Sequence, residues 1–257
     1  MQYHIIIQAR TGSKRLSNKI FKIINKRTVI DFLITRLLKH YPKDRIIIAT
    51  TLNKKDNKIA TYAKNKKLKL FRGSETNVMD RYVKCCEAYN VKNIVRITSD
   101  CPLLDASIIS KIWKLYKNKK LDYISNTLPP KESTFPDGSD IEIFKFKTLN
   151  LMNKKKLRMI DREHVTNLFW KTRKYNTLNY KNTINISQYK YSLDYKEDLS
   201  LIKKIIKKIG TKEINYNAIN IVNTIKKNNV LKKISTNSKK LFNNNRKDIY
   251  ENNSEVY

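Results

Sequence analysis

The first half of the chain alternates short apolar runs with longer segments in which apolar residues recur every three or four positions. Such alternation predicts β-strands and amphipathic α-helices in turn. The predicted strands are 3–9, 45–50, 68–71 and 93–98, and the predicted helices are 28–40, 55–66, 77–89 and 105–117. Because strands joined through helices pair in parallel by right-handed crossovers, this order predicts an α/β fold with a Rossmann-like, mostly parallel sheet.

Beyond a fifth predicted strand at 123–125 the alternation stops. Three prolines interrupt the chain before a strand-like run at 140–146, and the composition of 127–190 suits an inserted lobe. A helix returns over 195–209, with Gly210 as its stop signal. The last stretch, 235–257, is rich in Asn, Lys and Ser and predicts a poorly ordered basic tail. We therefore expect one domain over 1–234, with the lobe at 127–190.

The charge of the chain is strongly positive, with 55 Lys and Arg against 22 Asp and Glu and a net charge of +33. Such a charge suggests nucleic acid or an anionic surface as a partner. A compositional bias is the alternative, because the lysines are scattered over every predicted element instead of lining one face. The chain has no recognisable nucleic-acid-reading module, so we expect no specific nucleic-acid partner, and the charge still favours anionic ligands.

The cysteines and the hydropathy bear on the compartment. The three cysteines form no even framework and no metal-like spacing, which favours a reducing environment. No run approaches the roughly 18 apolar residues of a membrane span. We expect a cytoplasmic protein without membrane insertion.

The first predicted strand leads into the basic segment "QARTGSKRLSNK", residues 8–19. In a doubly wound sheet, ligands bind beyond the carboxyl ends of the strands, where this segment lies. Backbone N–H groups around Gly12 and Ser13 could face phosphate oxygens, with cationic side chains around them. The segment is neither a P-loop nor a dinucleotide fingerprint. A phosphate site and a solvated basic loop both remain open. The cations are Arg10, Lys14, Arg15 and Lys19.

Two aspartates follow predicted strands. Asp100 ends the fourth strand in "RITSDCPLLD", and Asp194 ends a strand-like run in "YSLDYKEDL". Carboxylates at the same sheet edge as a phosphate loop are placed to hold Mg²⁺. Caps of turns or helices are the alternative role for both.

These segments together resemble the cytidylyltransferases that activate sugar acids, the acylneuraminate and 3-deoxy-octulosonate cytidylyltransferases. The closest resemblance is to the branch named for spore coat polysaccharide biosynthesis protein F. The matching motifs occur in order over about residues 3–225: "IIIQARTGSKRL", "FRGSETNVMDRY" (71–82), "RITSDCPLLD" (96–105), "FPDGSDIEIF" (135–144), "DREHVT" (161–166) and "SLDYKEDL" (192–199).

The resemblance implies a nucleotidyltransferase fold of the GT-A-like type that binds CTP and Mg²⁺ and transfers a cytidylyl group to a sugar acid, releasing pyrophosphate. Lys19, Arg10 and Asp100 would be catalytic, and Asp100 and Asp194 would hold the metal. The nucleotide would contact Ala9, Arg10, Gly12, Ser13, Lys14, Arg15, Lys19, Arg72, Ser74 and Arg81. The sugar acid would contact Asp137, Asp140, Arg162 and His164. The inserted lobe implies a homodimer.

Some of these roles have simpler alternatives. Asp80 could sit at the third helical position and Arg81 could face solvent, without contact to a nucleotide. His164 could be a general base, and a hydrogen-bonded helix residue is the reading we favour. A nucleotidyl- or glycosyltransferase of the same fold with another acceptor is the main functional alternative, and a nucleic-acid-binding protein is the third.

Overall fold

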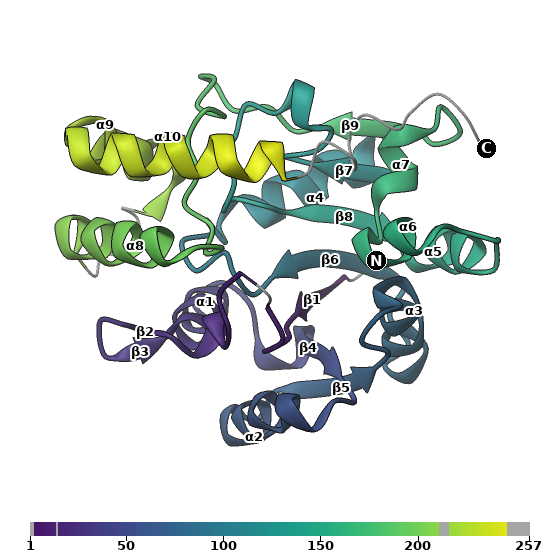
Figure 1. Cartoon of the computed structure of the whole chain (residues 1–257). Helices are drawn as coiled ribbons and strands as arrows, with labels where there is room; N and C mark the ends of the chain where they lie inside the picture. The colour runs from purple at the N-terminus through teal and green to yellow at the C-terminus, as the bar shows by residue number, and fades with distance from the viewer. Residues whose placement is uncertain (1–2, 14, 211–215, 246–257) are drawn as a thin grey trace.

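The computed structural model describes residues 3–13, 15–210 and 216–245, which build one α/β body around a central sheet (Figure 1). The sheet has seven strands in the order β5-β4-β1-β6-β8-β7-β9. The strands are β1 His4–Gln8, β4 Ile46–Thr51, β5 Lys69–Gly73, β6 Asn93–Thr98, β7 Tyr123–Ser125, β8 Glu142–Lys145 and β9 Thr177–Asn179, and a separate hairpin joins β2 Ile23–Ile24 to β3 Arg27–Thr28. Among the seven, only β8 runs antiparallel to its neighbours. The predicted mostly parallel sheet is confirmed.

Ten α-helices lie within the described residues. They are α1 Val29–Leu38, α2 Asn57–Lys66, α3 Val78–Ala88, α4 Ile108–Asn118, α5 Phe146–Asn153, α6 Met159–His164, α7 Asn167–Lys171, α8 Lys196–Ile209, α9 Ala218–Lys226 and α10 Asn229–Asn244. The start of α1 is capped as its sequence predicts, because the Thr28 hydroxyl accepts a hydrogen bond from the Asp31 backbone N–H at 3.2 Å. Four short 3₁₀ turns connect other elements: η1 Lys19–Phe21, η2 Lys43–Arg45, η3 Lys54–Asp56 and η4 Pro130–Glu132.

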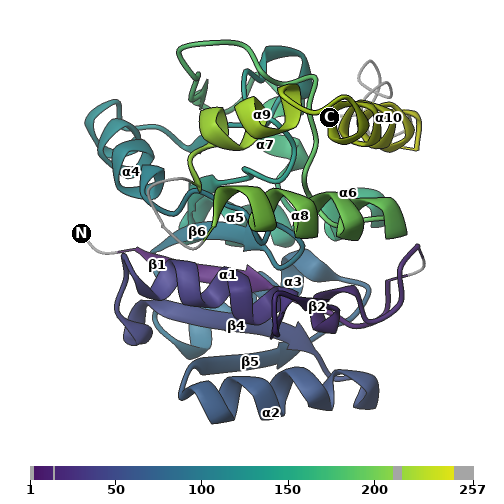
Figure 2. The ribbon, with the colours of Figure 1, turned by 90° about the vertical axis from the view of Figure 1, so that its left-hand side faces the viewer.

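Strand alternation places apolar side chains on both faces of the sheet. Ile5 and Ile7 of β1 pack with α1, α2 and α4, whereas Ile6 packs on the other face with α3, α5 and α7. A third apolar cluster joins α8, α9 and α10; α8 lies next to α1, and α9 and α10 lie on the far side of α8 in Figures 1 and 2. The carboxyl ends of β1, β4 and β6 therefore meet at one edge of a sheet that is covered on both sides.

The segment 127–190, expected as an inserted lobe, takes part in the central sheet. Its β8 pairs with both β6 and β7, and its β9 pairs with β7 at the end of the sheet. The helices α5 and α7 cover one face of the same core. Because its strands pair with the central sheet and its helices pack on one face of that sheet, this segment shares its core with the first half of the chain.

The C-terminal boundary differs from the prediction of a tail starting at residue 235. Helix α10 continues to Asn244, and its Ser235 and Ser238 are buried against the body. Few apolar residues suffice here, because these hydroxyls form hydrogen bonds within the body. The remaining predicted tail, 246–257, lies outside the described residues. No helix among the described residues is long and apolar enough to span a membrane.

Two adjacent residues of α10 test whether this helix is packed as described. Leu231 is 1% exposed and lies in the cluster shared with α8 and α9, while Val230 is 57% exposed. Leu231→Ala should lower the free energy of unfolding by about 2–5 kcal/mol, and Val230→Ala should change it by less than about 0.5 kcal/mol. Denaturant melts of both variants measure the difference. Equal, small effects would show that α10 is not packed on the body.

Candidate active site

A buried charge cluster joins the β1 loop to two aspartates. The Nζ atom of Lys19 lies 2.6 Å from Oδ2 of Asp100 and 3.1 Å from Oδ1 of Asp194. Asp100 follows β6, Asp194 precedes α8, and Lys19 begins η1 in the loop after β1. The structure therefore brings together the basic segment and both predicted strand-end acids, although these lie far apart in the sequence.

The pKa values in this cluster favour its charged form. Burial alone would lower the pKa of Lys19, but the carboxylates of Asp100 and Asp194 outweigh burial and raise it. Burial would raise the pKa of Asp100, but the Lys19 ammonium holds it below its usual range. The ion pairs compensate for lost hydration, so the cluster stays ionised at neutral pH.

Asp194 contacts two further cations. An Nη2 atom of Arg15 lies 2.7 Å from its Oδ1, and the buried Nζ of Lys190 lies 3.2 Å from its Oδ2. Burial would raise the pKa of Asp194, but Lys19, Lys190 and Arg15 together hold it far below its usual range. Sequence reasoning missed Lys190, because one lysine among 43 gives no signal of burial.

The entry to the β1 loop is fixed by Asp56, a residue that the sequence analysis also missed. Its Oδ1 accepts hydrogen bonds from both the backbone N–H and the hydroxyl of Thr11, at 2.8 and 2.6 Å. Its Oδ2 accepts one from the Thr51 hydroxyl at the end of β4. Burial would raise the pKa of Asp56, but these bonds lower it. The available signal was its place in "NKKDNK", just after the second strand.

The other loop residues divide into buried and accessible groups. Ala9 is 1% exposed and bonds through its backbone to β4. Arg10 forms a 3.3 Å ion pair with Glu163 of α6, in which both side chains are well exposed. The Ser13 hydroxyl accepts from the Leu16 backbone N–H at 3.4 Å. Gly12 has room for a Cβ atom, which would lie in ordinary contact with Glu75 at 3.5 Å. Lys14 lies outside the described residues.

Arg72 and Ser74, which were predicted to contact the nucleotide, lie around the ends of β4 and β5, and Arg72 holds these ends together. Its guanidinium donates to the carbonyls of Thr51 and Asn53 and to Oδ1 of Asn57, all at 2.9–3.0 Å. The Ser74 hydroxyl accepts from the Asn77 backbone N–H at 3.0 Å. Both residues thus have partners within the protein at the edge that leads to the β1 loop.

Arg81 is fully buried, which overturns the alternative that it faces solvent. Its Nη1 donates to the Ser74 carbonyl at 3.1 Å, and within the described part of the chain its Nε and Nη2 have no hydrogen-bond partner. Burial lowers the pKa of this guanidinium. Buried donors without partners are costly, so these two N–H groups are a strained feature of the site edge. Asp80 sits at the third position of α3, which is the alternative to a nucleotide contact given above, and its backbone N–H donates to Oδ1 of Asn77.

Asp137 and Asp140 form a second acidic pair beside Asp100. Oδ2 of Asp140 accepts from the Gly138 backbone N–H at 2.7 Å, and its Oδ1 accepts from the Thr127 hydroxyl at 3.0 Å. The Sγ of Cys101 lies 3.6 Å from a carboxylate oxygen of both Asp100 and Asp140, and so links the two acidic groups. Burial, together with the charge of Asp137, raises the pKa of Asp140 to about 6.

Gly138 is the residue that permits the tight turn between these acids. Its φ of +107° is strained for any side chain, and an added Cβ would lie 2.6 Å from the ring of Tyr191. The glycine of "FPDGSD" is thus required by the backbone.

Arg162 and His164 occupy α6 and its end. The guanidinium of Arg162 donates to Oδ1 of Asn153 and to the Lys155 carbonyl, at 3.3 and 3.1 Å, so these bonds direct it towards α5. The carbonyl of His164 accepts from the Thr166 backbone N–H across Val165, which has φ 62° and ψ −53°. This γ-turn is strained for a β-branched residue and fixes the direction in which the chain leaves α6.

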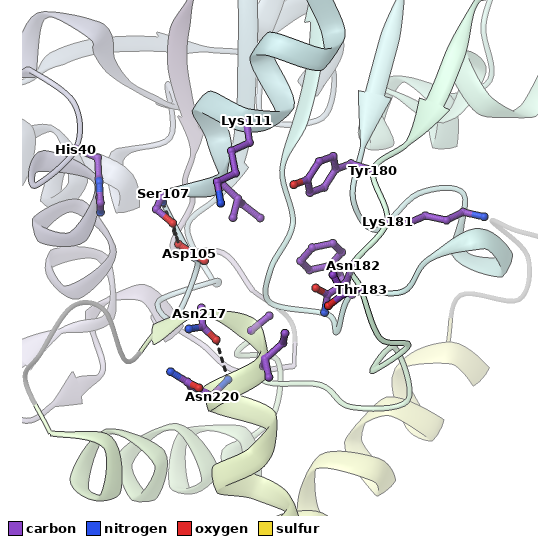
Figure 3. Close-up of a pocket in the computed structure, with 14 residues that line it drawn as sticks. His40, Asp105, Ser107, Lys111, Tyr180, Lys181, Asn182, Thr183, Asn217 and Asn220 are labelled. Carbon is purple, nitrogen blue, oxygen red and sulfur yellow. Dashed lines mark hydrogen bonds between the residues drawn. The ribbon is translucent and has the colours of Figure 1, made fainter.

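A separate cavity of about 720 Å³ lies between the starts of α4 and α9 and the segment after β9 (Figure 3). Asp105, Tyr180, Asn182 and Asn217 are among its lining residues. Lys19, Asp100 and Asp194 do not line it, so it is distinct from the charge cluster.

The donor set at Lys19 fits a hard divalent cation. Within the described ranges no group of three or more His, Cys, Asp or Glu residues is arranged to hold a metal. Mg²⁺ commonly takes only one or two carboxylates and completes its shell with water and phosphate oxygens. Asp100 and Asp194 share one ammonium and so lie close enough to share one ion, if Lys19 moves to other partners.

Comparisons of the sequence with known proteins show the family of the chain. Residues 4–221 match the family model described as cytidylyltransferase. An uncharacterised protein of Methanocaldococcus jannaschii, MJ1063, is 38% identical over 161 residues, which span 63% of this chain and 64% of that protein. The spore coat polysaccharide biosynthesis protein SpsF of Bacillus subtilis is 28% identical over 212 residues, covering 80% of this chain and 86% of SpsF.

Solved structures are similar over most of the chain. A cytidylyltransferase from Leptospira borgpetersenii matches with a TM-score of 0.82 and 28% identity, over 100% of both chains. CMP:2-keto-3-deoxy-manno-octonic acid synthetase, solved with CTP, matches with a TM-score of 0.62 and 12% identity, over 81% of this chain and 99% of that one. The second likeness concerns the fold alone.

The raised pKa of Asp140 predicts a pH-dependent stability. A carboxyl group whose pKa rises on folding costs stability as pH increases from about 4 to about 6, because only the unfolded chain releases the proton there. Asp140→Asn removes this cost, so the variant should gain stability relative to wild type by up to about 3 kcal/mol between pH 4 and pH 8. Thermal melts at both pH values measure the gain. A stability difference independent of pH would contradict the raised pKa.

Proposed function

Because the chain belongs to the cytidylyltransferase family, we propose that it transfers a cytidylyl group from CTP to a sugar acid of the nonulosonic or octulosonic type, releasing pyrophosphate. The product, a CMP-sugar, would serve polysaccharide or glycan biosynthesis. The observation that carries the proposal is the Lys19 ammonium held between Asp100 and Asp194 at the end of a basic loop. The activity of the CTP-bound synthetase supports this substrate class, and the name of SpsF supports a role in polysaccharide biosynthesis.

The β1 loop would bind the triphosphate. Arg10 and Arg15 are partly exposed, with 39% and 42% of their side chains accessible, so both can contact phosphate oxygens. Ser13 and the backbone around Gly12 add donors, and Ala9 contributes backbone alone. Negative charge develops on phosphoryl oxygens during the displacement, so fixed cations lower the barrier by electrostatic stabilisation. Lys14 is assigned to the same loop on its sequence position.

Asp100 and Asp194 would hold Mg²⁺, which supplies positive charge at the phosphate oxygens. In the same step Lys19 would exchange its two carboxylate partners for phosphate oxygens. The exchange keeps the charge balanced, because the Mg²⁺ ion would take the place of the Lys19 ammonium beside the two aspartates. A lysine with two possible sets of partners thereby links CTP binding to the acidic half of the site.

The base of CTP would lie near Arg81. Its two buried donors without partners among the described residues could each donate a hydrogen bond to a ligand oxygen. Arg72 and Ser74 would shape the same side through the bonds that they make to the ends of β4 and α3.

The acceptor would lie on the side of Asp137 and Asp140. Its anomeric hydroxyl oxygen forms the new bond to the α-phosphorus, while the bond to the bridging oxygen breaks and pyrophosphate leaves. The hydroxyl proton passes to a base, and Asp140, with a pKa of about 6, is suited to accept it. Arg162 and His164 remain assigned to the acceptor side as a proposal, although the bonds of Arg162 point towards α5.

We also propose that the protein works as a homodimer in the cytoplasm. Two apolar residues on the segment 127–190, Leu151 and Met159, are 55% and 61% exposed. Burial of both against a second copy would suit a dimer interface formed by α5 and α6.

Pyrophosphate release tests the reaction. Purified protein with CTP, Mg²⁺ and a panel of nonulosonic and octulosonic acids should release pyrophosphate with at least one acceptor. Asp100→Asn should reduce the rate by about 100-fold or more, because a metal ligand is lost. Asp105→Asn is the matched control, since its carboxylate bonds only Ser107 among the described contacts. No release with any acid, or an unchanged Asp100→Asn rate, would contradict the proposal.

The choice of nucleotide tests the role of the loop. CTP with Mg²⁺ should raise the melting temperature more than UTP or GTP at equal concentration, since ligand binding to the folded state stabilises it. Lys19→Ala should abolish most of this rise, and Lys240→Ala, on the exposed side of α10, should retain it. Equal stabilisation by all three nucleotides would contradict selectivity for CTP and would favour a nucleotidyl- or glycosyltransferase of the same fold.

A further inference from the structure

Helix α10 reaches the acidic half of the site from the C-terminal part of the chain. Three residues on its inner side form hydrogen bonds close to the predicted site aspartates. Ser235 bonds Lys190, Ser238 bonds Asp198, and Lys239 bonds Asp137. Their segment has the composition of a solvated tail, yet the side chains of Ser235 and Ser238 are buried. The helix therefore makes specific polar contacts rather than a purely apolar packing surface.

Ser235 fastens the extended segment that leads to Asp194. Its Oγ accepts from the backbone N–H of Lys190 at 2.9 Å and donates to the carbonyl of Lys190 at 2.8 Å. Further along the segment, the Leu193 backbone N–H donates to the Asp100 carbonyl at 2.8 Å. The segment is thus held between α10 on one side and the loop of Asp100 on the other.

Ser238 fastens the start of α8. Its hydroxyl donates to Oδ1 of Asp198, while Oδ2 of Asp198 accepts from Lys190 Nζ and from the Asp194 backbone N–H, both at 2.8 Å. The side chains of Lys190 and Asp198 are 0% exposed. A buried pair of this kind keeps its geometry only while all of its hydrogen bonds are made.

The buried pair of Lys190 and Asp198 sets the orientation of the Asp194 carboxylate. Its Oδ2 faces Lys190 in the interior, whereas its Oδ1 faces Lys19, which also contacts Asp100. On the acceptor side, Lys239 lies 2.5 Å from Oδ2 of Asp137. Helix α10 therefore contacts Asp198, which holds Asp194, and also Asp137 of the second acidic pair.

We propose that α10 is a positioning element of the active site, in which Ser238 holds Asp198 and Lys190 so that one oxygen of Asp194 stays turned towards Asp100. The role rests on the proposed function for the assignment of Asp100 and Asp194 to a metal. Groups that orient metal ligands from behind commonly change metal affinity by about 10–100-fold when removed.

Binding of Mn²⁺ to the full chain in the presence of saturating CTP tests this role, because the phosphate oxygens then offer Lys19 partners other than the two aspartates. Ser238→Ala should weaken Mn²⁺ binding by about tenfold. Ser238→Thr keeps the hydroxyl and should restore binding to within about twofold of wild type. Thr236→Ala removes a hydroxyl of the same helix that bonds back to the Lys232 carbonyl, and it should leave the affinity unchanged. Affinities are measured at a temperature where melting curves show every variant folded.

Two results would overturn the role. If Ser238→Ala lowers the melting temperature but binds Mn²⁺ as wild type does, α10 only stabilises the fold. If the wild-type chain binds no Mn²⁺, both the metal assignment and this role fail. A wild-type chain that binds Mn²⁺, with Ser238→Ala weakened, but transfers no cytidylyl group would contradict the proposed function and leave the role of α10 supported.

Discussion

The sharing of one lysine ammonium by two aspartates is the interaction on which the rest of the site depends. Asp100 and Asp194 come from distant parts of the chain, and two carboxylates placed side by side would repel each other without a cation. Lys19 supplies that cation from the β1 loop, so the loop must bend back to the end of β6. Asp56 holds the start of the same loop through Thr11, and the loop path is thereby fixed at both ends.

The positive charge of the chain has two parts with different meanings. The net charge of +33 comes largely from lysines distributed over all elements, which tells little about function. The scarce arginines, in contrast, occupy defined places: Arg36 donates to the Leu104 carbonyl, Arg72 clamps the ends of β4 and α2, and Arg81 is buried beneath Ser74. These three arginines therefore have defined structural partners, whereas the total charge identifies no particular surface.

Much of the fold, and the grouping of part of the candidate site, could be predicted from local signals. Apolar periodicity gave the strands and helices of the first half, and Asp100 and Asp194 were found because acids at strand ends share one edge. Asp56 and α10 were missed, because Asp56 bonds Thr11 and α10 bonds Lys190 and Asp198 across 40 or more positions of the chain. Lys190 was missed, because one lysine among 43 gives no signal of burial. The Asn, Lys and Ser composition of α10 is typical of a solvated tail, so it did not indicate that Ser235 and Ser238 are buried. The motif that contains Arg162 did not indicate that this side chain bonds towards α5.

The central claim is that Lys19 leaves the two aspartates when CTP and a divalent metal bind. A crystal structure of the protein with CTP and Mn²⁺, with the metal located by its anomalous scattering, tests this claim most directly. The account predicts one Mn²⁺ ion ligated by both Asp100 and Asp194, and Lys19 Nζ bonded to phosphate oxygens. A structure in which CTP is bound while Lys19 still bridges the two carboxylates, with the metal elsewhere, would contradict it.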